Sequence, residues 1–189
     1  MAESILRDSI VQTHQYLIEM EAIMIIRGKS IVLNRNNVST DQIFPGKYVN
    51  LTDASEIADH VLEGLDPGIK RRIKPESILV VGKNFGCGSS REQAVIALKE
   101  SGVCAVIAES AGRIWYRNAI NLGLPVILIQ DPAGKIGDDE ELEIHLEKGL
   151  VKNISKAVDY QGEPVADFIL EIFESGGIKP MMRKKYGSS

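Results

Sequence analysis

The hydrophobic and polar positions of the chain become regular from residue 78 onward. Three apolar runs of strand length follow one another, Ile78–Val81, Val103–Ala108 and Pro125–Ile129, and a segment of helical pattern separates each from the next. The middle run is almost uninterrupted, which is typical of a strand buried on both faces of a parallel sheet. The pattern predicts an α/β protein with a βαβαβ core and right-handed crossovers.

The segments before this core have weaker patterns. Two β-prone runs at 22–26 and 30–33 flank Arg27-Gly28-Lys29, and they predict a hairpin. Asp53-Ala54-Ser55-Glu56 has the spacing of a capping box. We expect it to open a helix that ends near Gly64.

The segments after the core differ in kind. Apolar residues alternate with charges over 142–146, which predicts a half-exposed antiparallel strand. Lys148-Gly149 would turn that strand toward a second one at 151–154. Pro164 is placed to begin a final helix, which would end at Gly176-Gly177.

These patterns divide the chain of 189 residues into three parts. Residues 3–21 have the apolar spacing of a helix, so 1–22 are interpreted as a helical extension. Residues 23–178 are long enough to form one compact domain with its own core. Residues 179–189 are basic and are expected to be a mobile tail.

Composition narrows the class of protein. The hydrophobic share of 44% and the charged share of 25% are those of an ordinary globular protein. A net charge of -4 argues against a nucleic-acid binder, and no apolar run approaches membrane-spanning length. Residues 1–21 carry acidic groups and lack a basic head before an apolar stretch, so they do not resemble a signal peptide. A cytoplasmic location is expected.

The most informative stretch is Gly82–Gly102, directly after the first strand of the core. It begins as a glycine-rich loop, and Ser89 and Glu92 have the S-x-x-E spacing of a capping box that would open the following helix. A strand, a glycine loop and a capped helix together point free backbone N–H groups at an anion. The lysine of a nucleotide-binding P-loop is missing, and Arg91 stands where a dinucleotide loop has glycine. A turn whose serines only cap a helix remains an alternative, but Gly-Cys-Gly-Ser-Ser-Arg-Glu is longer than a cap requires.

Three segments resemble one known family. Asn84–Glu92, reading NFGCGSSRE, resembles the signature of the small subunit of 3-isopropylmalate dehydratase, which is equivalent to the swivelling fourth domain of aconitase. Asn37–Tyr48 is similar to the family segment N-x-x-T-D-x-I-x-P-x-x-Y, and Ala111–Pro125 to F-x-R-N-x-x-N-x-G. The resemblance covers roughly residues 23–177 and implies a three-layer β/β/α swivelling domain.

The resemblance also implies roles for individual residues. Ser89 would be the catalytic base of a hydro-lyase, and Arg91 would bind a substrate carboxylate. Ser90 and Gly88 would support the binding of substrate. Thr40 and Asp41 would assist the site, with a turn-forming aspartate as the competing interpretation of Asp41. Arg113, Arg117 and Asn118 would either brace the site or form surface contacts, and both interpretations are open.

No metal site is predicted on this chain. Cys87 and Cys104 lack metal-ligand spacing, as do the histidines at 14, 60 and 145. Cys87 could be a nucleophile at a helix N-terminus, but a small residue that lets the loop turn is the favoured interpretation. Hydro-lyases of this family use a 4Fe-4S cluster, which needs several cysteine thiolates. The resemblance therefore implies that the cluster lies on a separate large subunit, which would be the partner of this chain.

The loop that follows the T-D-x-I-x-P segment would select the substrate. It comprises Lys47, Tyr48, Val49, Asn50 and Leu51. Relatives that act on tricarboxylic acids place an arginine there, and this loop has none. The resemblance therefore implies the isomerisation of 2- and 3-isopropylmalate in leucine biosynthesis. The alternatives are a citramalate or dimethylmalate dehydratase, a homoaconitase, with Lys47 as the missing cation, or a non-catalytic anion-binding regulatory module.

Overall fold

The computed structural model of the chain describes residues 25–187. The helix predicted at 3–21, and with it the extension at 1–22 and His14, lies outside these residues. The strands are β1 (Ile25–Leu33), β2 (Ser77–Val81), β3 (Val103–Ala108), β4 (Val126–Leu128), β5 (Glu141–His145), β6 (Leu150–Asn153) and β7 (Val158–Gln161). The α-helices are α2 (Thr40–Ile43), α3 (Ala54–Asp59), α4 (Gln93–Glu100), α5 (Arg113–Asn121), α6 (Pro132–Lys135), α7 (Asp167–Glu174) and α8 (Ile178–Tyr186). Short 3₁₀ segments lie at Gly46–Tyr48, Ile69–Arg72 and Leu146–Lys148.

The seven strands of residues 25–187 form one mixed sheet in the order β4-β3-β2-β1-β5-β6-β7. β1 to β4 are parallel, and β5, β6 and β7 add to the edge of β1 as an antiparallel meander. The predicted βαβαβ unit is present as β2, α4, β3, α5 and β4. The strand expected at 103–108 has those bounds, and the α/β class is confirmed.

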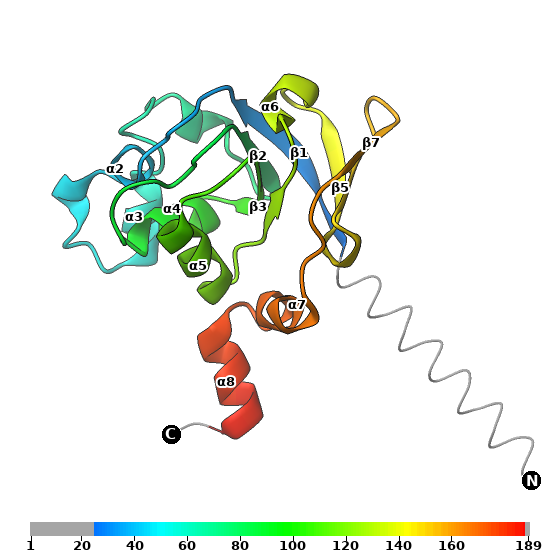
Figure 1. Ribbon diagram of the computed structural model, residues 1–189. Coiled ribbons are helices and arrows are strands. Elements are labelled where there is room, and N and C mark those ends of the chain that lie inside the picture. The colour runs from blue at the N-terminus through cyan, green and yellow to red at the C-terminus, as the bar shows by residue number, and fades with distance from the viewer. Residues whose placement is uncertain (1–24, 188–189) are drawn as a thin grey trace, which may run out of the picture.

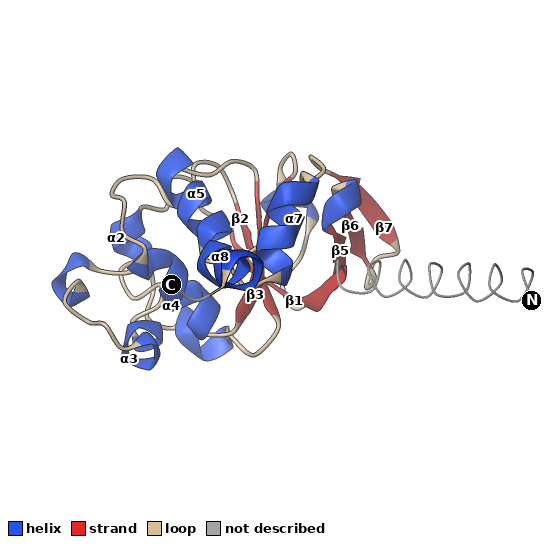
Figure 2. Ribbon diagram, turned by 90° about the horizontal axis from the view of Figure 1, so that it is seen from below, coloured by secondary structure: helices blue, strands red, loops and turns tan. Residues whose placement is uncertain are grey.

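The core lies on both faces of the parallel strands. On one face, Leu79, Val81 and Val106 pack with residues of the helical layer such as Leu98 and Trp115. Figures 1 and 2 show α3, α4 and α5 together on that side and the antiparallel strands on the other.

On the opposite face, Ile78, Val80 and Ile107 share a second apolar cluster with Leu142 and Ile144 of β5. Strands β5 and β6 therefore cover part of the sheet to which they belong. Because strands twist relative to their neighbours, a long sheet can fold over its own face in this way. The result is the β/β/α layering implied by the resemblance, within one continuous sheet.

The predicted hairpin around Arg27-Gly28-Lys29 is wrong. These residues lie in the middle of β1, which pairs with β5 from Ile25 onward and with β2 up to Leu33. Gly28 is required by close packing, because a Cβ at this position would lie 1.9 Å from the carbonyl oxygen of Glu76. The glycine therefore marks the close approach of another backbone and not a turn.

One predicted helix is shorter than expected. Asp53 caps α3 as expected, its carboxylate accepting the N–H groups of Ser55 and Glu56, but the helix ends at Asp59 and turns continue to Leu65. The basic tail expected to be mobile is largely helical. It forms α8, which buries Met181 beside α7. Met181 thus gives this basic segment one buried apolar position.

The remaining predictions hold with small shifts of boundary. The antiparallel strand at 142–146 is β5, and the turn at Lys148-Gly149 leads into β6 as predicted. The last predicted helix is α7, which begins three residues after Pro164. Within residues 25–187, no helix is long and apolar enough to cross a membrane.

Candidate functional site

The glycine-rich loop after β2 connects the three segments that carry the family resemblance. Its Cys87 pairs with Ser39 as a parallel bridge, and its Phe85 pairs with Ala111. The N–H of Thr40 donates to the carbonyl of Cys87 at 2.8 Å. The loop is therefore held between the chain that leads into α2 and the chain that leads into α5, at the carboxyl ends of the parallel strands, where open α/β sheets bind ligands.

Gly86 shows why this loop needs glycine. Its φ of 74° lies in the left-handed region, and a Cβ there would lie 2.2 Å from the ring of Trp115. Trp115 is buried beneath the loop and meets Phe85 edge to face at 4.9 Å between ring centroids. The indole is thus the platform on which the loop rests, and it comes from α5.

Ser89 is bound to Thr40 in two ways. The two hydroxyl oxygens lie 2.9 Å apart, and the backbone N–H of Ser89 donates to Thr40 Oγ1 at 3.1 Å. Thr40 is completely buried, whereas Ser89 is half-buried at the surface of the loop. The pair joins the predicted base to the T-D pair of the upstream segment.

The capping box predicted at Ser89 and Glu92 is wrong. Helix α4 begins at Gln93, and its N-cap is Glu92, which makes no side-chain capping bond. Ser89 lies four residues before the helix, because its hydroxyl and its N–H are both bound to Thr40. A tertiary contact has therefore replaced the local cap. The N-terminal, positive end of the α4 dipole lies at Gln93 and not at Ser89.

Arg91 and Asp41 form an ion pair beside this serine. Arg91 Nη1 lies 2.8 Å from Asp41 Oδ1 and donates to the carbonyl of Phe44 at 3.0 Å. The Arg91 side chain is 19% exposed and that of Asp41 is 62% exposed. The hydrogen bond from Arg91 holds the pKa of the Asp41 carboxyl below its usual value. Asp41 therefore stays ionised and orients the guanidinium.

The predicted specificity loop lies next to Arg91. The guanidinium is 3.5 Å from the place that a side chain on Gly46 would occupy, and the Gln93 amide donates to the carbonyl of Val49 at 3.3 Å. Val49 is 43% exposed and Asn50 is exposed, while Leu51 packs against the core. Val49 thus presents exposed apolar surface in the loop whose preceding residue, Gly46, lies against the predicted carboxylate-binding arginine.

A second polar cluster, which sequence reasoning missed, lies behind this loop. Glu63 accepts hydrogen bonds at Oε1 from Lys47 Nζ and from the Tyr48 hydroxyl, both at 2.9 Å. Its Oε2 lies 2.7 Å from His60 Nδ1, and the His60 ring stacks on Tyr48 with centroids 3.5 Å apart. These contacts, with Lys47 first, lower the pKa of Glu63 to about 2. No local signature connects residues 12 to 16 positions apart, so spacing alone gave no signal.

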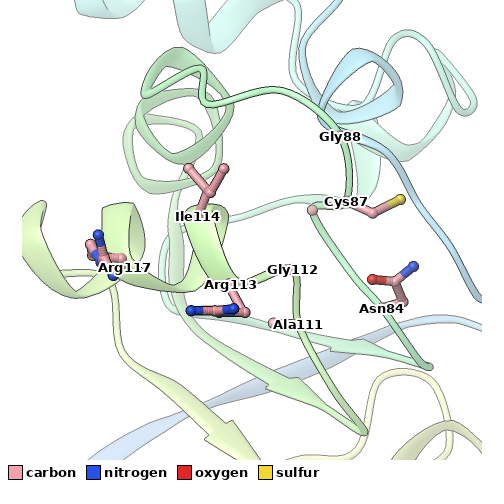
Figure 3. Close-up of a pocket in the computed structure, with 9 residues that line it drawn as sticks. Asn84, Cys87, Gly88, Ala111, Gly112, Arg113, Ile114 and Arg117 are labelled. Carbon is pink, nitrogen blue, oxygen red and sulfur yellow. The ribbon is translucent and has the colours of Figure 1, made fainter.

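A pocket of about 640 Å³ opens between the glycine loop and the first turns of α5. Figure 3 shows Asn84 and Cys87 on the loop side, and Arg113, Ile114 and Arg117 on the helix side. The residues that line it include two arginines and no acidic side chain.

Ser89 and Arg91 are not among the lining residues of this pocket, although Gly88 is. Asn118 Nδ2 donates to the carbonyl of Ser90 at 3.1 Å and ties α5 to the serine segment. Of the three α5 residues left open above, Asn118 therefore contacts the predicted site, and Arg113 and Arg117 line the pocket next to it.

The residues present do not fit an iron–sulfur cluster. The Cys87 thiol points to the carbonyl of Asn37 at 3.6 Å, and the Cys104 thiol, on β3, to that of Ser77 at 3.5 Å. Burial raises the pKa of Cys104 to about 11, which disfavours the thiolate that a cluster requires. Among residues 25–187, no three His, Cys, Asp or Glu side chains gather as a metal site would need.

The fold and the loop define a class: the chain is a swivelling domain of the aconitase type. Residues 67–131 match the family model described as the aconitase C-terminal domain. Those residues contain β2, the glycine loop, α4, β3, α5 and β4.

The relatives define the family more closely. The chain is 46% identical over 154 residues to the isopropylmalate/citramalate isomerase small subunit of Methanocaldococcus jannaschii, covering 82% of this chain and 92% of that one. It is also 46% identical over 154 residues to the methanogen homoaconitase small subunit of Methanothermobacter thermautotrophicus, with 82% and 88% covered.

Among solved structures, that of a 3-isopropylmalate dehydratase from Methanocaldococcus jannaschii matches with a TM-score of 0.79 and 41% identity, covering 86% of this chain and 95% of that one. The chain belongs to the family of 3-isopropylmalate dehydratase small subunits.

Proposed function

We propose that this chain is the small subunit of a two-subunit hydro-lyase that isomerises 2- and 3-isopropylmalate by dehydration and rehydration, as in leucine biosynthesis. It is active only with a large subunit, which carries a 4Fe-4S cluster, and the complex is cytoplasmic. The family membership and the relatives' names support the reaction class. The observation that carries the proposal is the hydrogen bond between the Ser89 and Thr40 hydroxyls, together with the ion pair between Arg91 and Asp41 from the same two segments.

Ser89 serves as the base in this proposal, and Thr40 makes that role physically reasonable. A hydroxyl has one proton to donate and two lone pairs that accept. Thr40 Oγ1 accepts the N–H of Ser89, and the two hydroxyl oxygens lie 2.9 Å apart. An ionised Ser89 oxygen can only accept, so in that state Thr40 donates its proton to Ser89. A hydrogen bond donated to the charged form of a group lowers its pKa. Thr40 therefore stabilises the serine alkoxide that removes a proton from the carbon next to a substrate carboxylate.

Arg91 binds a carboxylate of the substrate in this proposal. The described contacts with Asp41 and Phe44 all use Nη1, so Nη2 and Nε remain for a planar carboxylate. A guanidinium can present two parallel N–H groups to such a ligand. Asp41 fixes the orientation of the fork, while Ser90 and the backbone of Gly88 line the approach to Ser89.

Departure of the substrate hydroxyl requires an electrophile that this chain does not supply. The cysteines of the described part do not fit a cluster. The cluster belongs to the large subunit, and it supplies Lewis-acid chemistry when the two chains assemble. The small subunit contributes the base and the carboxylate clamp, which must face the partner for the site to be complete.

The loop at 47–51 favours an alkyl group over a third carboxylate. It carries no arginine, and Lys47, which could have replaced one, is paired with Glu63 at 2.9 Å. Burying a branched alkyl group stabilises binding by about 1.5–3 kcal/mol, whereas a carboxylate desolvated without a partner costs more than that. These observations favour isopropylmalate, and also smaller alkylmalates such as citramalate or dimethylmalate, over homoaconitate.

Reconstitution tests the proposal. The chain is purified alone and together with its cognate large subunit, and turnover of isopropylmalate, methylmalates and homoaconitate is measured side by side. The proposal predicts turnover of the alkylmalates by the pair and none by either chain alone. Turnover by the isolated small subunit would contradict it. Tight carboxylate binding without turnover in any complex would favour a regulatory module.

A further inference from the structure

The cluster around Glu63 bears on the substrate choice of the proposed reaction. We propose that Glu63 is a specificity-determining positioning residue: it holds Lys47 away from the substrate, so that the loop presents apolar Val49 and no cation. This inference rests on the proposed function, and it explains how a loop that contains a lysine can still favour an alkylmalate. Nothing in the local pattern of the loop indicates this role.

Glu63 contacts the loop through two adjacent side chains. Its Oε1 accepts from both Lys47 Nζ and the Tyr48 hydroxyl at 2.9 Å, and Lys47 Nζ also lies over the Tyr48 ring, 4.6 Å from its centroid. His60 contacts the other carboxylate oxygen, with Nδ1 2.7 Å from Glu63 Oε2. The ammonium therefore has two neighbours, the Glu63 carboxylate and the face of the Tyr48 ring.

The position of Glu63 is itself fixed. The preceding residue, Leu62, is buried, and its N–H donates to the carbonyl of Ile43 at 2.7 Å. Ile43 ends α2, the helix that contains Thr40 and Asp41. Helix α2 thus contains Thr40 and Asp41, which contact Ser89 and Arg91. The same helix binds the backbone next to Glu63. The position of Glu63, and with it that of the loop, is therefore fixed relative to the predicted site.

The charges of the pair reinforce one another. Hydrogen bonds from Lys47 first, and then from His60 and Tyr48, lower the pKa of Glu63 to about 2, and Glu63 first, and then Tyr48, raise the pKa of Lys47 above its usual value. Both groups are therefore ionised at any working pH. Releasing Lys47 requires breaking this pair, and a third carboxylate on the substrate would have to compete with Glu63 for the ammonium.

Glu63→Gln breaks the charge pair while keeping an oxygen that can accept from Tyr48. The assembled enzyme is assayed with 3-isopropylmalate and with homoaconitate, and the ratio of the two kcat/KM values is compared with that of the wild type. We expect the ratio to shift toward homoaconitate by at least about tenfold, mainly through a lower KM for that substrate. Adding Lys47→Met to Glu63→Gln should return the ratio to within about twofold of the wild type, because the released cation is then gone.

Asp59→Asn is the matched control. It removes one carboxylate from the neighbouring helix α3, where Asp59 is paired with Lys70 at 2.6 Å, and it should leave the ratio unchanged. A merely structural role for Glu63 would lower kcat/KM for both substrates alike and leave their ratio unchanged, and that result overturns the inference. So does a ratio that stays shifted in the double variant.

If Glu63→Gln does not fold, the single variant Lys47→Met still tests the inference. The Lys47 side chain is 63% exposed, so we expect its replacement to leave folding intact. The inference expects a ratio within about twofold of the wild type, because Glu63 already withholds the cation. A shift of the ratio away from homoaconitate by about tenfold or more would overturn it. If the wild-type complex converts neither substrate, the proposed function fails; if it converts 3-isopropylmalate while the Glu63→Gln ratio is unchanged, only this inference fails.

Discussion

The Thr40 hydroxyl oxygen lies 2.9 Å from Ser89 Oγ and accepts the N–H of the same serine at 3.1 Å. This double contact joins residues 49 positions apart and places a buried donor against the oxygen proposed as the base. It also explains why Ser89 does not cap the following helix. The local pattern predicted a hydrogen bond from a backbone N–H of the helix to the Ser89 hydroxyl, but in the fold this hydroxyl is bound to that of Thr40.

Thr40→Val should lower kcat with little change in KM. Valine matches the shape of threonine but cannot donate to the serine oxygen, and it leaves the Ser89 N–H without its acceptor. A hydrogen bond to a charged group contributes about 1.5–3 kcal/mol, which corresponds to a loss of roughly 10- to 150-fold in kcat. Steady-state kinetics of the assembled enzyme measure this change.

Thr40→Ser is the control, because it keeps the hydroxyl and should retain most of the rate. The role of Thr40 is contradicted if valine and serine reduce kcat equally, since that result would show a packing effect and not a donated hydrogen bond.

Arg91→Lys should mainly weaken substrate binding. An ammonium cannot present two parallel N–H groups to a carboxylate, so KM should rise by about 10- to 100-fold while kcat changes less. Arg71→Lys makes the same chemical change on an exposed residue before the start of β2, at the end of the strand opposite the glycine loop, and should have no effect. A fall in kcat at unchanged KM would instead assign Arg91 to the chemical step.

Stability at acid pH should report on Glu63. Its pKa is lowered from 4.5 to about 2, so the folded state is stabilised by the ionised group above pH 4.5, and this contribution is lost as the pH falls from 4.5 toward 2. Thermal unfolding of wild type and Glu63→Gln is compared across this range, in which the other acidic groups are common to both proteins. The difference in Tm should shrink as the pH is lowered. A difference that stays constant would show that Glu63 is not coupled to Lys47 in solution.

The strands of the core were predictable because parallel strands that are buried on both faces have nearly continuous apolar sequences. Val103–Ala108 shows this best, since both of its faces pack against other layers. The contents of the loop after β2 were predictable for a different reason: their residue types match a family segment by segment. In neither case did the prediction depend on contacts between distant parts of the chain.

Three of the failures lie where contacts between distant parts of the chain decide the structure. Gly28 looked like a turn because the approach of Glu76 cannot be read from its neighbours in sequence. Ser89 looked like a cap because its competing partner, Thr40, lies 49 residues away. Glu63 gave no signal at all, since its role exists only once the loop after α2 and the turn after α3 lie side by side.

The most direct test of the account concerns Ser89 in the assembled enzyme. Ser89→Ala removes the proposed proton acceptor, while the backbone N–H that binds Thr40 remains, so folding and assembly with the large subunit should be retained. The cost in stability should be about 1 kcal/mol, the value of one ordinary hydrogen bond. Ser90→Ala, which removes the neighbouring hydroxyl, serves as the matched variant and should impair substrate binding more than turnover.

The deciding measurement is kcat for isopropylmalate isomerisation by the purified complex of Ser89→Ala with the large subunit, after size-exclusion chromatography has shown that the complex is intact. The account predicts that turnover is abolished in this variant while the Ser90→Ala complex remains active. Near-native kcat in the intact Ser89→Ala complex would contradict the assignment of Ser89 as the base.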